Sequence, residues 1–126
     1  MPLSDFESKF FEHRQDDSAQ DVTIVRILMS HMTDEDNIEV FGLDLCALVE
    51  QYNCTRVIID AEKIEYVTSS VLGKLITLHR KLGREAGRMV MCQVGSAFGD
   101  VLQTSRLHSY FTMCDTIDEA LQQISA

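Results

Sequence analysis

Apolar residues along the chain alternate between the spacing typical of strands and the spacing typical of helices. Segment 22–29 is rich in β-branched residues and partly alternating, which predicts a strand. The short apolar run 56–60 is bounded by polar residues, which predicts a central, parallel strand buried on both faces. Segment 88–94 predicts a further strand. Weaker patterns at 6–15 and 111–113 predict a first edge strand and a short last strand.

Helical spacing of apolar residues separates these strands. The expected helices span residues 33–52, 68–83, 97–104 and 115–124. The acidic residues that open the first of them suit the positive end of a helix dipole. Gly83 is the predicted C-cap of the second helix.

The order of these elements predicts an α/β fold in a single domain spanning residues 1–126. We expect a mostly parallel mixed sheet of four to five strands, with about four helices in a single layer against it. Residues 1–20 form an N-terminal segment that could supply an edge strand. If Phe10 and Phe11 lie exposed on that strand, they could support a homodimer.

Charge narrows the choice of partner. The chain has 11 Lys and Arg against 20 Asp and Glu, a net charge of −9. Nucleic acids and anionic membrane surfaces repel such a chain. The acids are concentrated in residues 1–65, which is a weak indication of a protein partner with a basic patch. No apolar run is long enough to span a bilayer, and the start of the chain is unlike a secretory signal, so we expect a cytoplasmic protein.

Metal and redox chemistry have little support in the sequence. Cys46, Cys54, Cys92 and Cys114 form no CxxC pair, and each has apolar neighbours, so buried reduced thiols are expected. The four histidines show no zinc-ligand spacing. We therefore expect no metal and no cofactor.

Catalytic motifs are missing as well. The sequence contains no phosphate-binding glycine loop, no G-x-S-x-G and no HExxH. The paired carboxylates 16–17 and 34–36 are explained by turns and helix caps, and His79 lies on an apolar helical stripe. We expect a protein with no catalytic residues, not an enzyme.

Three successive hydroxyls, Thr68-Ser69-Ser70, stand out between a buried strand and an amphipathic helix. One interpretation is structural, because Ser and Thr oxygens accept hydrogen bonds from the free N–H groups of a helix start. The other is regulatory, because a helix N-terminus favours a phosphate. The pattern alone favours the cap and leaves both open.

The motif around these hydroxyls resembles that of the STAS domain, the fold of bacterial anti-sigma-factor antagonists. Val57-Ile58-Ile59-Asp60 and then Val67-Thr68-Ser69-Ser70-Val71-Leu72-Gly73 carry the resemblance, which extends over about Asp21 to Ile124. Two positions depart from the family pattern, because Thr68 replaces an Asp and Val71 replaces a Gly.

The resemblance implies an anti-sigma-factor antagonist that binds an anti-sigma factor with serine kinase activity and is restored by a PP2C-type phosphatase. It implies phosphorylation at Ser70, with Ser69 and Thr68 as alternatives. The expected partner-binding residues are Asp34, Thr68, Ser69, Ser70, Val71, Gly73 and Lys74. Two other functions stay open: a STAS-like scaffold that is never phosphorylated, and a small-molecule sensor with an anion pocket at the same helix start.

Overall fold

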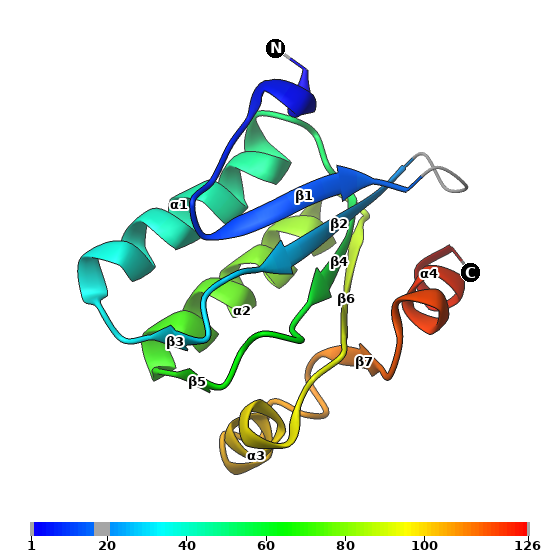
Figure 1. The fold of residues 1–126 in the computed structure, drawn as a ribbon. Coiled ribbons are helices and arrows are strands. Elements are labelled where there is room, and N and C mark those ends of the chain that lie inside the picture. The colour runs from blue at the N-terminus through cyan, green and yellow to red at the C-terminus, as the bar shows by residue number, and fades with distance from the viewer. Residues whose placement is uncertain (1, 17–20, 126) are drawn as a thin grey trace.

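The computed structural model describes residues 2–16 and 21–125. These residues contain a five-stranded sheet with the strand order β1-β2-β4-β6-β7 (Figure 1). The strands are β1 (Phe11–Gln15), β2 (Val22–Ile27), β4 (Arg56–Asp60), β6 (Arg88–Cys92) and β7 (Thr112–Cys114). β1 is antiparallel to β2, and the other neighbouring pairs are parallel. The expected mostly parallel mixed sheet is confirmed.

The helices follow the expected order. They are α1 (Glu35–Glu50), α2 (Ser69–Arg84), α3 (Ser96–Thr104) and α4 (Ile117–Ser125), with a short 3-10 helix, η1 (Leu3–Asp5), before β1. A second small sheet, which the sequence pattern did not predict, pairs β3 (His31–Met32) with β5 (Tyr66–Val67) in parallel. The expected α/β fold class is therefore confirmed.

The end of α2 differs from the expectation. Gly83 lies inside the helix, which continues to Arg84, so the prediction of Gly83 as the C-cap is wrong. Ala86 instead takes the left-handed conformation, with φ of 57°. The N–H of Gly87 then donates to the carbonyl oxygen of Leu82 at 2.8 Å, which closes the last turn.

One face of the sheet packs against α1 and α2, which lie side by side (Figure 1). The sheet contributes alternate positions of its strands, and the helices contribute their apolar stripes. Representative members of this core are Val25, Ile27, Val57, Ile59, Phe41, Leu45, Leu75 and Leu78. At about 25 cal/mol per Å² of apolar surface, burying such a cluster is the main force that holds the two helices on the sheet.

The opposite face packs against α4. Ile24, Ile58 and Val90 of the sheet form a second apolar cluster with Ala120 and Ile124 of this helix. The expectation of a single layer of helices is therefore wrong for α4, although it holds for α1 and α2. The reason is the central strand β4, whose apolar residues point to both faces and require cover on both.

Phe10 and Phe11 are buried, with exposed fractions of 3% and 1%. Both rings contact the ring of Phe41 on α1 in edge-to-face geometry. The premise that these two side chains lie exposed on the edge strand is therefore wrong, and the expected homodimer loses that support. They anchor the start of β1 under α1 instead.

Candidate functional site

The N-terminal ends of α1 and α2 meet beside the small sheet. β3 runs directly before α1 and β5 directly before α2, and their pairing aligns His31 with Tyr66 and Met32 with Val67. The two helices therefore begin next to each other, beyond the carboxyl ends of β2 and β4 (Figure 1). Open α/β sheets commonly place their functional groups at this edge.

Ser70 and Glu35 are brought together by this arrangement. The Ser70 hydroxyl donates to the Glu35 carboxylate, at 3.2 Å from Oε2 and 3.3 Å from Oε1. Ser70 lies in the first turn of α2, and Glu35 is the first residue of α1. The contact is at the surface, so the serine oxygen is held on the outside of the molecule.

Asp34, one of the expected partner-binding residues, makes a hydrogen bond within its own helix. It is the N-cap of α1, and its carboxylate accepts a hydrogen bond from the N–H of Asn37 at 3.0 Å. The residue that contacts Ser70 is its neighbour Glu35, which the sequence reasoning missed. The acidic cluster was visible in the sequence, but a cap pattern does not show which carboxylate turns toward another helix.

Thr68 occupies the N-cap position of α2 without capping it. Its side chain makes no cap hydrogen bond, and within the described ranges its Oγ1 is buried and has no hydrogen-bond partner. The expectation that a hydroxyl of Thr68-Ser69-Ser70 caps this helix is therefore wrong. The first N–H groups of α2 are left without a side-chain acceptor, which suits an incoming anion.

Ser69, Val71 and Gly73, which were also expected to bind the partner, differ in how exposed they are. Ser69 and Gly73 are exposed, and a Cβ added at Gly73 would meet no atom within 4 Å. Val71 is fully buried in the core, so its side chain packs inward rather than toward a docked protein. The β-branched residue that departs from the family pattern therefore serves packing.

Lys74 is held one turn further along α2. Its Nζ lies 2.7 Å from Oε1 of Glu39 on α1, and its stem lies against Gly42. A Cβ added at Gly42 would approach Cδ of Lys74 to 2.5 Å, so the glycine makes room for this stem. The charged face of α1 is thus partly neutralised at Glu39.

The thiols offer little nucleophilic chemistry. Cys54 and Cys92 are buried, but Cys46 and Cys114 are only half-buried, so the expectation of buried thiols is wrong for that pair. Burial, reinforced by the charge of Asp60, raises the pKa of Cys92 to about 12. This thiol therefore stays protonated near neutral pH. No three metal-ligating side chains converge in residues 2–16 and 21–125.

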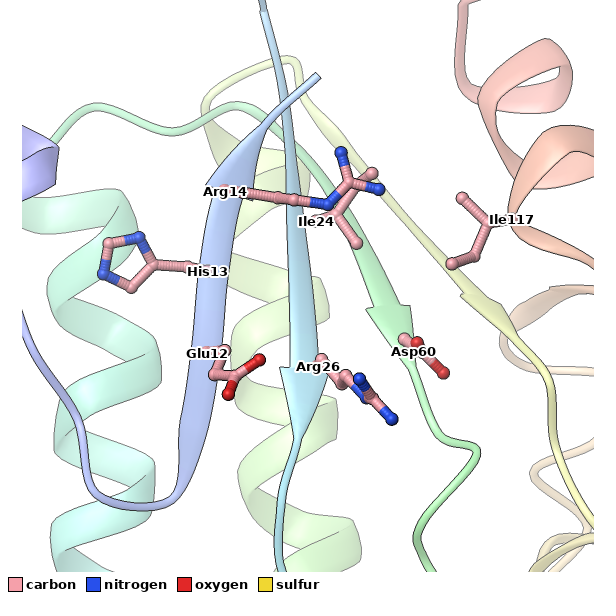
Figure 2. A pocket seen from close by; sticks show the side chains of 7 residues that line it. All are labelled: Glu12, His13, Arg14, Ile24, Arg26, Asp60 and Ile117. Atoms are coloured by element: carbon pink, nitrogen blue, oxygen red, sulfur yellow. The ribbon is translucent and has the colours of Figure 1, made fainter. Parts of the chain in front are cut away.

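A cavity of about 240 Å³ lies elsewhere, over β1, β2 and β4 and beside Ile117, the first residue of α4. Figure 2 shows Arg14 of β1 extending toward Ile24 of β2, and Arg26 of β2 beside Asp60 of the neighbouring strand β4. Arg26 is paired with Glu62 at 3.4 Å. Neither Ser69 nor Ser70 lines this cavity, so it is separate from the hydroxyls that begin α2.

Comparison with protein families gives a match over nearly the whole chain. The model of the STAS domain family matches residues 2–120. No protein of curated function has a sequence that matches this one significantly.

Solved structures share the fold at low sequence identity. An anti-sigma factor antagonist from Mycobacterium paratuberculosis is 21% identical, with a TM-score of 0.77 and complete coverage of both chains. A putative antagonist from Thermotoga maritima is 16% identical, with a TM-score of 0.76 and coverage of 94% of this chain and 97% of that one. The phosphorylated form of the Bacillus cell fate determinant SpoIIAA is 21% identical, with a TM-score of 0.66 and coverage of 90% and 98%.

Proposed function

This chain belongs to the STAS domain family, and from that premise we propose that it is an anti-sigma-factor antagonist switched by phosphorylation at Ser70. Its general resemblance to such antagonists rests on the family match and on the shared fold. The single observation that carries the switch is the surface position of the Ser70 hydroxyl in the first turn of α2, against Glu35.

Ser70 is favoured over Thr68 by accessibility, and over Ser69 by its position in the family motif. The Thr68 oxygen is buried, so a kinase has no path to it in this conformation. Ser69 is exposed and stays the alternative. Ser70 matches the acceptor position of the family motif, and its oxygen already faces a surface carboxylate.

The proposed partner is an anti-sigma factor that is also a serine kinase, and a PP2C-type phosphatase reverses the reaction. In the forward step, a bond forms between Ser70 Oγ and the γ-phosphorus of ATP as the bond to ADP breaks. The hydroxyl proton passes to a base. The unmodified chain binds the partner, with Ser69, Ser70, Gly73 and Lys74 at the contact.

The phosphate acts on binding through charge. It adds about two negative charges to a surface that already carries Glu35. Burying those charges in an interface costs desolvation energy, and a facing carboxylate adds repulsion. The phosphorylated chain therefore releases its partner.

The domain acts by binding rather than by catalysis, and in the cytoplasm. Within the described ranges, no helix combines the length and the apolar character that a membrane span requires.

Affinity capture from the native cell tests this proposal, with the wild-type chain and the Ser70→Glu variant as paired baits. We expect one kinase-like protein to bind the wild type and to be lost from the variant. Incubation with that protein and ATP should add one phosphoryl group to the wild type and to Ser69→Ala, but none to Ser70→Ala, by intact mass. Equal retention by both baits would contradict the switch.

A second candidate function is a STAS-like scaffold that is never phosphorylated. The replacement of the family Asp by Thr68, whose hydroxyl is buried, favours it, because the carboxylate that the family motif places two residues before the acceptor is missing. In that case the captured partner binds both baits and transfers no phosphate. The third candidate, a small-molecule sensor with an anion pocket at the start of α2, gains no support from the cavity of Figure 2, because neither Ser69 nor Ser70 lines it.

A further inference from the structure

A row of polar contacts follows the outer edge where α1 packs against α2. We call this row the polar seam, and its members are Glu35, Glu39 and Glu50 on α1 and Ser70, Lys74 and Lys81 on α2. Each carboxylate of the seam meets a donor on the other helix. Two of the donors are lysines, and the third is the hydroxyl of Ser70.

Lys74 pairs with Glu39 across the seam and lies one helical turn beyond Ser70 on α2. Its stem lies over Gly42, and its ammonium group is now paired with Glu39 on the neighbouring helix. Ser70 precedes Lys74 by four residues on α2, so the two side chains are neighbours on the helix surface. The lysine side chain is 26% exposed and the Glu39 side chain is 67% exposed, so water and room for rearrangement are at hand.

We infer that Lys74 is the residue that receives the phosphate: when Ser70 is phosphorylated, Nζ leaves Glu39 and pairs with the phosphate. This inference rests on the proposed function, because it takes the phosphate at Ser70 as given. It assigns to Lys74 a regulatory role that is distinct from its pairing with Glu39 in the unmodified chain.

Charge decides the exchange. The phosphate carries about two negative charges against one on Glu39, so it attracts the ammonium group more strongly at a similar distance. An acidic group four residues before a lysine is also the favourable order on a helix, in keeping with the helix dipole. The free N–H groups at the start of α2 add to the stabilisation of the phosphate.

The same phosphate displaces Glu35. Its carboxylate is 3.2 Å from the oxygen that becomes phosphorylated, and two anions at that separation repel each other. Glu35 and Glu39 then both lose their present seam partners. The first turns of α1 thus become more negative than the phosphate alone would make them, which extends the repulsion of a partner from α2 onto α1.

Phosphorus NMR of the full chain, with phosphoserine introduced at position 70 during synthesis, tests this exchange. A paired lysine stabilises the dianion and lowers the second pKa of the phosphate. We expect Lys74→Met to raise that pKa by about 0.3 pH unit or more. Lys74→Arg should keep the wild-type value, because it keeps the charge.

Lys81→Met is the matched control. Lys81 forms the same kind of ion pair with Glu50 in the same seam, but 11 residues beyond Ser70. It should leave the phosphate pKa within error of the wild type. A titration of Lys74→Met that coincides with the wild type overturns the inference, and so does an equal shift in both methionine variants.

The result is independent of any kinase, because the phosphoserine is built into the chain. If no kinase modifies Ser70, the proposed switch fails while the pairing with Lys74 is still measured. If Lys74→Met leaves the titration unchanged although a kinase does modify Ser70, only the inference about Lys74 fails.

Discussion

Ser70 Oγ donates to the carboxylate of Glu35 at 3.2 Å, across 35 positions of sequence. The contact depends on the parallel pairing of β3 with β5, which sets the starts of the two helices side by side. A serine that donates to a carboxylate keeps its lone pairs directed away from that group. Modification of the Ser70 hydroxyl removes this hydrogen bond, so it changes a contact of α1 before any partner is bound.

The coupling between these residues predicts a double-mutant result. Ser70→Glu places two carboxylates where a hydrogen bond exists now, and facing like charges are destabilising by about 0.5 kcal/mol. We expect Ser70→Glu to reduce the free energy of unfolding more in the wild-type background than in Glu35→Gln. Urea unfolding of the four proteins measures the difference. Additive effects would mean that the two side chains do not interact in solution.

The surroundings of Gly87 and Gly83 predict that substitution by alanine has opposite effects on stability at the two positions. A Cβ on Gly87 would lie 2.0 Å from the carbonyl oxygen of Thr55, so Gly87→Ala forces backbone apart and should cost about 2 kcal/mol or more. Gly83 lies within α2 and has open space at its Cβ position. Gly83→Ala should therefore stabilise by up to about 1 kcal/mol, through helix propensity. Thermal or urea unfolding compares the two, and a loss of stability in both would contradict the prediction.

Replacing Thr68 and Thr116 by valine compares a threonine hydroxyl that has no hydrogen-bond partner with one that caps a helix. The Thr68 hydroxyl is buried without a partner, so Thr68→Val removes an unsatisfied group at nearly constant shape. We expect it to leave the free energy of unfolding unchanged or to raise it by about 1 kcal/mol. Thr116 Oγ1 accepts the N–H of Glu119 at 3.1 Å at the start of α4, so Thr116→Val should lose about 1 kcal/mol. Equal losses in urea unfolding would show that Thr68 is hydrogen-bonded after all.

His79 predicts a dependence of stability on pH. Its ring contacts Tyr110 and Phe111, and burial lowers its pKa below the ordinary value of 6.5. Just below pH 6.5 the unfolded chain thus binds more protons at this residue than the folded chain does. The contribution of His79 to stability is complete above that pH and is lost as pH falls through the folded pKa.

Urea unfolding between pH 7.5 and pH 5, values chosen to bracket about 6.5, measures this effect. The decline in the free energy of unfolding should be smaller in His79→Phe than in the wild type. His108→Gln, at an exposed position, is the matched control and should follow the wild-type profile. An unchanged slope in His79→Phe would contradict the assignment.

The order of elements could be predicted from the sequence because it depends on local patterns. The run Arg56–Asp60 is apolar at every interior position, which already indicates a central parallel strand. The first turn of α1 is acidic, as the pattern predicted, and the structure identifies Asp34 as its cap. The motif around Ser70 likewise indicated the place of the proposed switch, since the start of a helix is a local property.

Contacts between distant segments could not be predicted in the same way. β3 and β5 have only two residues each, too few to produce a periodic pattern, yet their pairing brings Glu35 to Ser70. Thr68 appeared to be a cap by residue type, but the path of the chain buries its oxygen. The sequence left Phe10 and Phe11 as candidates for exposed side chains on the edge strand, but Phe41 on α1 supplies a surface that covers them.

By itself, the sequence determined the succession of strands and helices, the acidic character of the first half and the hydroxyls at the start of α2, because each is a property of neighbouring residues. Only the tertiary structure decided which carboxylate meets Ser70, that Lys74 pairs with Glu39 of α1, and that α4 covers the second face of the sheet. The physical reason is that side-chain partners are selected by packing in three dimensions, where residues 35 positions apart become neighbours.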